Sequence, residues 1–188
     1  VPLDVLYADD AIIVVDKRAG QVVHPGAGHT DDTVVNALLA RFPDMATAFD
    51  GPRPGIVHRL DRDTSGVMVA ARTPAAAEAL MAAFKARAVE KVYLALTTGA
   101  LTPLEGLIDA PVARDPQRRQ RMAVAPGGRA SRTSYRVLAH LGGGPAGPEH
   151  SWLRLEPYSG RTHQIRVHLR AIGHPIVGDA VYGRRSRH

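Results

Sequence analysis

The chain has 188 residues, of which 45% are hydrophobic and 22% charged, and this composition indicates a globular protein with a substantial core. The absence of cysteine excludes disulfides and thiol chemistry, and no apolar run approaches the roughly 18 residues of a membrane span, so we expect a cytoplasmic location and no membrane partner. The net charge of +6 comes mainly from arginine, because only three of the 24 basic residues are lysines, and clustered arginines favour a nucleic-acid partner over a merely solvated basic face.

In the first half of the chain, residues 2–20 read as two strands around the Asp9–Asp10 turn. Residues 31–42 predict a helix because apolar side chains recur at helical spacing, at Val34, Val35, Leu38, Leu39 and Phe42. The prolines and glycines of residues 43–55 indicate a loop, and residues 66–73 a short buried strand. A second helix begins with Thr73 as N-cap and Pro74 in its first turn, and its apolar face consists of Ala77, Leu80, Met81 and Phe84.

The second half is richer in strands. Residues 91–99 predict a strand, and residues 106–128 a strand, a basic loop and another strand. Two further strands, 132–141 and 150–160, flank a connection rich in glycine and proline. Residues 162–173 predict a helix with Thr162 as its cap, Ile165 and Leu169 on one face, and Gly173 at its end.

Because strands outnumber helices and occur in neighbouring runs, the sequence predicts an α+β fold with a mostly antiparallel sheet. We find no repeat and no linker that would divide the chain, so residues 1–188 are expected to form one domain. The chain begins with Val1 inside an apparent strand, and we therefore expect it to be a piece of a longer protein.

The segment HRLDRDTSG, residues 58–66, places unusual charge between two apolar stretches. Asp61 lies between Arg59 and Arg62, whose positive charge favours an ionised carboxylate that could act as a nucleophile or base. The alternative is a simple turn, and Asp63–Gly66 are all good turn-forming residues. A turn, however, does not require His58, Arg59 or Asp61.

A second polar cluster opens the helix predicted at residues 162–173. Arg161, His163, Gln164 and Arg166 crowd a helix start, which favours anions. Metal binding is the rival reading, but His163 and His168 are five residues apart and so point about 140° away from each other. No phosphate-binding or dinucleotide-binding glycine motif and no GxSxG motif is present, which disfavours nucleotide cofactors and serine hydrolases.

Three segments in this order resemble signature regions of the RluA family of pseudouridine synthases: HRLDRDTSG, KVYLALTTG at 91–99, and GRTHQIRVH at 160–168 followed by GDAVYG at 178–183. Residues 2–26 extend the likeness, especially to the ribosomal large-subunit pseudouridine synthase D group. The resemblance implies a bifurcated, mostly antiparallel mixed sheet with flanking helices and a central catalytic cleft. It also implies isomerisation of uridine in RNA without cofactor or metal.

Carried over by position, Asp61 matches the catalytic aspartate of the family. The resemblance further implies that Tyr93 packs against the target base, that Arg166 pairs with the aspartate, that Ile165 lies near the base, and that Arg59 is associated with the flipped-out nucleotide. Members of the D group usually also carry an N-terminal S4-like RNA-binding domain and a C-terminal extension, and we expect both to be missing from these 188 residues.

We expect a monomer that binds RNA, with large-subunit ribosomal RNA as the substrate and transfer RNA as an alternative. The basic residues predicted to contact RNA are Arg114, Arg118, Arg119, Arg121, Arg129, Arg161 and His163. Two other functions stay open from the residues alone: an RNA-binding module without catalysis, and a metal-dependent nuclease that uses Asp61 and Asp63.

Overall fold

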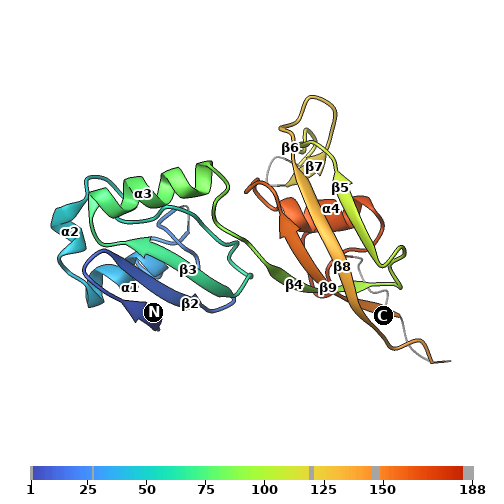
Figure 1. The fold of residues 1–188 in the computed structure, drawn as a ribbon, viewed down its shortest axis with the longest axis horizontal. Coiled ribbons are helices and arrows are strands. Elements are labelled where there is room, and N and C mark those ends of the chain that lie inside the picture. Colours follow the sequence, from blue (N-terminus) through green and yellow to red (C-terminus); the bar gives the residue numbers. More distant parts are fainter. Residues whose placement is uncertain (1, 27, 119–120, 145–148, 184–188) are drawn as a thin grey trace. The chain divides into compact units, whose positions relative to one another are not determined.

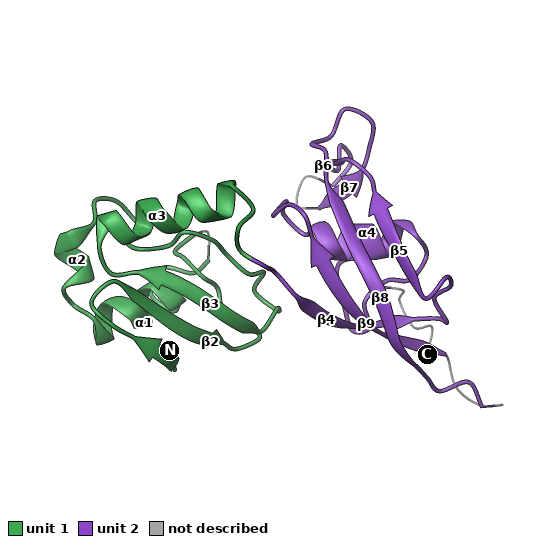
Figure 2. Cartoon of the chain, viewed as in Figure 1, with its two compact units in different colours: residues 1–89 green, residues 90–188 purple. Residues whose placement is uncertain are grey.

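The structure, a computed structural model, describes residues 2–26, 28–118, 121–144 and 149–183. The chain divides into two compact units, Val1–Val89 and Glu90–His188 (Figures 1 and 2). We had expected no such division. That both units belong to one catalytic domain stays a prediction. Among the described residues, no helix combines the length and apolar character that crossing a bilayer requires.

The first unit is built on an antiparallel sheet in the order β1–β2–β3, with β1 at Asp4–Ala8, β2 at Ile12–Lys17 and β3 at Gly66–Ala71. The predicted hairpin is confirmed. Its turn is held by the Asp9 carboxylate, which accepts the backbone N–H groups of Ala11 and Ile12 at 2.8 and 2.7 Å. Along β2, Ile13 and Val15 are buried, as the two-residue period of a strand requires.

Three helices accompany this sheet: α1 (Val34–Arg41), α2 (Met45–Ala48) and α3 (Pro74–Lys85) (Figure 1). Thr33 caps α1 in a reciprocal arrangement, in which its hydroxyl accepts the Asn36 N–H and the Asn36 side chain accepts the Thr33 N–H. Thr73 caps α3 and Pro74 follows in its first turn, as predicted.

Two expectations for this unit were wrong. Residues 43–55 are not all loop, since they contain α2, whose Met45 is fully buried. Met81 does not lie on the buried face of α3, because its side chain is 51% exposed. Ala77 is the one buried residue of α3, so only a narrow strip of the helix surface is fully covered.

The second unit has a four-stranded antiparallel sheet in the order β4–β9–β8–β5. Its strands are β4 (Tyr93–Thr98), β5 (Glu105–Asp109), β8 (Arg132–Leu141) and β9 (His150–Pro157). A separate hairpin of β6 (Val112–Arg114) and β7 (Met122–Val124) carries the arginine-rich turn, and α4 (Gln164–Ala171) is the only helix among the described residues of this unit. The core contains Leu153, Leu155 and Leu169, all fully buried.

The predicted start of α4 was wrong. The residue before the helix is His163, which has a left-handed backbone (φ 55°) and makes no capping hydrogen bond, so Thr162 is not the cap. Instead, the Gln164 side chain accepts the Arg161 N–H at 3.1 Å and bonds to Ser159. The end of the helix at Gly173, with φ 85°, is as predicted.

All pairings between the named strands are antiparallel, and a single parallel bridge joins Val22 and Thr33. With few helices and mainly antiparallel sheets, the predicted α+β class is confirmed.

Gly55 lies directly against β3, three residues before the charged segment 58–66. Its carbonyl accepts the Ala71 N–H at 2.9 Å, and its φ is +70°. A Cβ here would lie 2.1 Å from the Ala71 carbonyl oxygen and 2.7 Å from Met45 Cε. Only glycine therefore fits.

We expect Gly55→Ala to lower the free energy of unfolding by about 3 kcal/mol or more, because a left-handed backbone and a steric clash combine. Gly51 is the matched control: its φ is +92°, but nothing lies within 4 Å of a Cβ placed there. Gly51→Ala should cost only about 1 kcal/mol. Urea unfolding followed by circular dichroism measures both, and equal losses would contradict the proposed clash.

Candidate functional site

Asp61 lies on a turn of the first unit, and its side chain is half-buried. The Asp61 carbonyl accepts the Thr64 N–H at 3.1 Å, which closes a turn over Asp61–Thr64. Leu60, the preceding residue, is 7% exposed and anchors the turn in the core. The segment does contain a turn, but it spans Asp61–Thr64 rather than Asp63–Gly66, since Gly66 already begins β3. The turn holds the candidate carboxylate at the surface of a packed unit.

His58 fastens the beginning of the segment to β3. Its Nε2 accepts the Val69 N–H at 3.1 Å, and its ring stacks on Phe84 of α3 with the ring centroids 4.7 Å apart. Because Nε2 is the acceptor of this hydrogen bond, the contact selects the tautomer that carries its proton on Nδ1. Arg59, which follows, is exposed.

Lys17, at the end of β2, fastens the other side of the turn. Its side chain is fully buried, and Nζ donates to the carbonyls of Arg18, Gln21 and Arg62 at 2.8–2.9 Å. The Arg62 carbonyl also accepts the Gly20 N–H at 2.9 Å. Burial lowers the pKa of Lys17, while the Asp63 and Asp61 carboxylates act in the opposite direction. The ammonium group therefore both ties down the backbone beside Asp61 and lies within the field of its carboxylate.

Arg62 forms a bidentate ion pair with Asp63, at 3.0 and 3.1 Å, and both side chains are well exposed. Such an exposed pair contributes little to stability.

In the second unit, Arg166 of α4 makes a bidentate ion pair with Asp179. Arg166 Nε and Nη2 donate to the two carboxylate oxygens at 2.7 and 3.0 Å, and the two side chains are 18% and 5% exposed. The Arg166 guanidinium also lies 4.9 Å from the centre of the Tyr182 ring. Both contacts fix the direction of the guanidinium group.

Asp179 is itself well satisfied. One of its oxygens accepts the N–H groups of Val181 and Tyr182 at 2.9 and 3.0 Å. Burial acts to raise the pKa of Asp179, but the Arg166 guanidinium and these two N–H donors outweigh it, so that the pKa is lower than usual.

Tyr182 connects this pair to the arginine-rich hairpin. It is 3% exposed, and its hydroxyl accepts the Met122 N–H of β7 at 2.8 Å. His163 Nδ1 lies 2.8 Å from the same oxygen. One tyrosine therefore joins the start of α4, the hairpin and Arg166.

The other two residues predicted to bind substrate, Tyr93 and Ile165, are half-buried and pack against the core cluster that contains Leu155 and Leu169. Tyr93 begins β4 and pairs with Leu155 of β9. Asp61 and Arg59 belong to the first unit, whereas Tyr93, Ile165 and Arg166 belong to the second. The pairing of Asp61 with Arg166 therefore stays a prediction.

The predicted RNA-contacting residues belong to the second unit. Arg114, Arg118, Arg129 and Arg161 are exposed, Arg121 and His163 are half-buried, and Arg119 lies outside the described residues. In the described part of the chain, no group of three or more His, Cys, Asp or Glu side chains is arranged to hold a metal ion. His168 is fully buried and lies within hydrogen-bonding distance of Thr133 and the Ala110 carbonyl, which accounts for it as a structural residue.

The family model for RNA pseudouridylate synthases matches residues 11–171. The chain belongs to this family.

Relatives agree with this assignment across both units. The chain is 48% identical over 187 residues to the ribosomal large subunit pseudouridine synthase D of Pseudomonas aeruginosa, covering all of this chain and 55% of that protein. It is 46% identical to an uncharacterized RNA pseudouridine synthase of Synechocystis, covering 97% of this chain and 55% of the relative. The chain thus spans about half the length of these relatives.

Among solved structures, human RNA pseudouridylate synthase domain containing 1 matches with a TM-score of 0.79 and 34% sequence identity, covering 98% of this chain and 71% of that one. The pseudouridine synthase fold expected from the three sequence motifs is thereby confirmed.

Three residues of the chain gained a role only from the structure. By residue type alone, Lys17 would be placed at the surface. Its position two residues after Val15 on β2, however, puts it on the buried face of the strand, and this spacing could have indicated its burial. Asp179 and Tyr182 lie in the GDAVYG segment, which the sequence marks as a motif without showing what its side chains contact.

We expect Lys17→Met to lower the free energy of unfolding by about 3 kcal/mol, because three carbonyls lose their shared donor. The matched control is Lys85→Met, since Lys85 is exposed at the end of α3. Circular dichroism in urea gives the stability, and hydrogen exchange of residues 58–64 reports on the turn. Unchanged exchange at the turn would contradict the tethering role of Lys17.

Asp179→Asn should cost about 3 kcal/mol at pH 7, because the buried Arg166 guanidinium loses its charged partner. The folded-state pKa of Asp179 is depressed, so its stabilising contribution is present above the unfolded pKa and is lost as the pH falls through the folded value. The wild-type chain should consequently lose more stability than the variant on acidification.

Trp152, the single tryptophan, reports on unfolding of the second unit. Asp109→Asn, at an exposed carboxylate of the same unit, is the control and should change stability little. Parallel pH profiles for wild type and Asp179→Asn would show that the ion pair does not contribute as described.

Proposed function

We propose that this chain isomerises uridines in RNA to pseudouridine, with large-subunit ribosomal RNA as the substrate and Asp61 as the essential carboxylate. The observation that carries the proposal is the fastening of the Asp61 turn by Lys17, His58 and Leu60, in a chain of the RNA pseudouridylate synthase family. The ribosomal substrate is supported by the name of the Pseudomonas aeruginosa relative, which matches the whole chain.

The reaction suits a single carboxylate. The bond between N1 of uracil and C1′ of the ribose breaks, and the base rejoins the sugar through C5. The C5 proton is lost and N1 gains a proton, so no atom is added overall. Breaking the glycosidic bond places positive character on the sugar, which a negatively charged side chain stabilises, as in glycoside hydrolysis.

The remaining predicted residues supply the environment. Tyr93 and Ile165, both packed on the core of the second unit, provide apolar surface that would exclude water from the detached uracil. Arg166, aimed by Asp179 and Tyr182, would pair with the Asp61 carboxylate. The exposed Arg59 would occupy the space left by the everted nucleotide.

Asp61→Asn tests the proposal, because the amide keeps the size of the side chain and removes its charge. Incubation with unmodified large-subunit ribosomal RNA, followed by carbodiimide mapping, measures pseudouridine formation. We expect the rate to fall by a factor of about 10³ or more. Asp63→Asn is the matched control, two residues away and already paired with Arg62, and should retain most of the activity.

Each alternative has its own outcome. Equal activity of the wild type and Asp61→Asn would show that Asp61 is not essential for the reaction. RNA binding without any pseudouridine would favour a binding module, and modification of transfer RNA alone would replace the ribosomal substrate. Shortened RNA whose formation is blocked by a chelator would instead indicate the nuclease that uses Asp61 and Asp63.

A further inference from the structure

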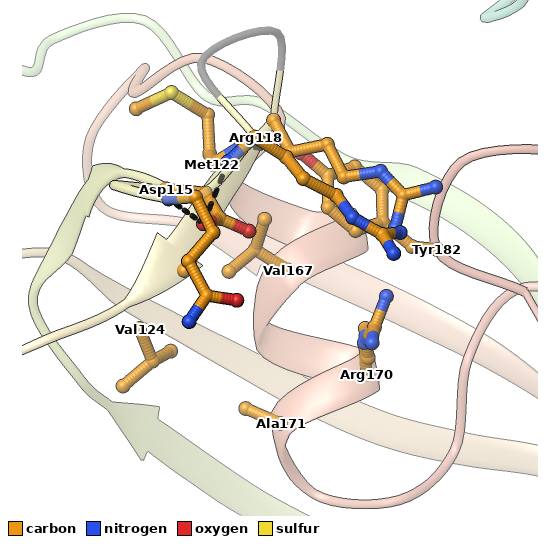
Figure 3. A pocket seen from close by; sticks show the side chains of 11 residues that line it. Asp115, Arg118, Met122, Val124, Val167, Arg170, Ala171 and Tyr182 are labelled. Atoms are coloured by element: carbon orange, nitrogen blue, oxygen red, sulfur yellow. Dashed lines mark hydrogen bonds between the residues drawn. The ribbon is translucent and has the colours of Figure 1, made fainter.

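A pocket of about 420 Å³ lies between the β6–β7 hairpin and α4 in the second unit (Figure 3). Its lower wall is apolar, formed by Val167 and Ala171 of α4 and by Val124 of β7. Three arginines line it as well: Arg118 and Arg121 come from the hairpin, and Arg170 comes from the last turn of α4. Figure 3 shows the side chain of Arg170 rising from the helix towards the hairpin.

The same three arginines also border an adjoining hollow of about 370 Å³ next to Ala180 and Val181. Their side chains thus line two neighbouring hollows, a position that a ligand can reach. Residues far apart in the sequence supply them, so that the basic cluster is a product of the fold.

The acidic group at the pocket does not neutralise these arginines. The Asp115 carboxylate is turned to its own loop, where it accepts the N–H groups of Gln117 and Arg118 at 2.9 and 3.1 Å. Within the described ranges, no carboxylate forms an ion pair with the side chain of Arg118, Arg121 or Arg170. The pocket is therefore lined by three arginines and one carboxylate, which leaves it with a net positive charge.

Three convergent guanidinium groups match the chemistry of a phosphate. Each presents N–H donors in a planar fork, which fits two phosphate oxygens at once. The apolar wall suits the ribose carbons that adjoin a phosphate in a nucleic-acid strand, and three arginines would repel a metal cation.

We propose that Arg118, Arg121 and Arg170 form a binding site for one backbone phosphodiester of the RNA substrate. The proposal deepens the proposed function and rests on it, because it assigns a contact of that same RNA. Its new element is Arg170, which the sequence did not mark, together with the convergence of the hairpin and α4 on a single phosphate.

The site has a direct connection to Arg166, the predicted partner of Asp61. Tyr182 lines the pocket, its hydroxyl accepts the Met122 N–H of the hairpin, and its ring lies beneath the Arg166 guanidinium. Tyr182 therefore joins the wall of the pocket to the Arg166 guanidinium. Binding of the RNA strand at this site would hold the β6–β7 hairpin against α4, the helix that carries Arg166.

Arg170→Ala is the principal test, with Arg41→Ala as its matched control, since both arginines are exposed in the last turn of an eight-residue helix. Fluorescence anisotropy measures binding of a labelled oligouridylate at a series of salt concentrations. We expect Arg170→Ala to weaken binding about 5-fold to 10-fold at low salt and to reduce the slope of log K against log salt by about 0.7, the value for one single-strand phosphate contact. Arg41→Ala should change neither quantity.

A double-mutant cycle tests whether the arginines act on one phosphate. If they do, Arg118→Ala should have a much smaller effect in the Arg170→Ala background than in the wild type. In NMR spectra, the side-chain Nε–H signals of Arg118, Arg121 and Arg170 should shift together on addition of the oligouridylate. Independent effects of the two substitutions would overturn the single site.

Inorganic phosphate and uridine monophosphate distinguish the phosphodiester from a free phosphate group. The oligouridylate should displace either one from the pocket. If the monoester instead saturates the three signals and the oligouridylate does not compete, the site belongs to a free phosphate and the RNA contact is refuted.

The failure of this site and that of the proposed function give different results. Asp61→Asn should abolish pseudouridine formation but leave the Arg170-dependent binding of oligouridylate intact. Active wild-type protein whose KM and salt slope are both unaffected by Arg170→Ala would overturn the phosphate site alone. Normal Arg170-dependent binding with no pseudouridine formed by the wild type would overturn the proposed reaction and leave the phosphate site standing.

Discussion

The buried ammonium group of Lys17 is the interaction on which the Asp61 turn depends. A lysine removed from water is costly unless its hydrogen bonds are replaced, and here three backbone carbonyls replace them. One of those carbonyls belongs to Arg62, the residue after Asp61. The hydrogen bonds that satisfy the buried ammonium group therefore also hold the backbone of the turn, and the backbone that carries Asp61 has a defined position in the free protein.

The second unit also contains a buried charged group that holds its surroundings in place, and here the charge is negative. Asp179 is almost fully buried, and it accepts hydrogen bonds from Arg166 and from two backbone N–H groups. Because Tyr182 covers Arg166 and bonds to the hairpin, the orientation of this guanidinium is coupled to the basic segment that we propose to contact RNA. Both predicted partners, Asp61 and Arg166, are thus fixed by buried polar networks rather than by exposed ion pairs.

Much of the local structure was predictable from the sequence. Alternating apolar residues indicated β2, and the Thr–Pro pair marked the start of α3, because these signals act over a few neighbouring residues. The errors have a common cause. Thr162 is a good N-cap by type, yet the cap position is taken by His163, whose left-handed backbone is not indicated by its residue type. Met81 lies at helical spacing but on the exposed side of α3.

The sequence by itself determined the family, the α+β class and the identity of Asp61 as the candidate carboxylate, because long ordered motifs and short-range periodicity are properties of the chain alone. Only the tertiary structure decided that Lys17 is buried beneath the turn, that Asp179 aims Arg166, and that Arg170 lies near Arg118 and Arg121. These residues are separated by 13 to 52 positions, and the spacing of residue types along the chain does not indicate which distant side chains packing will bring together.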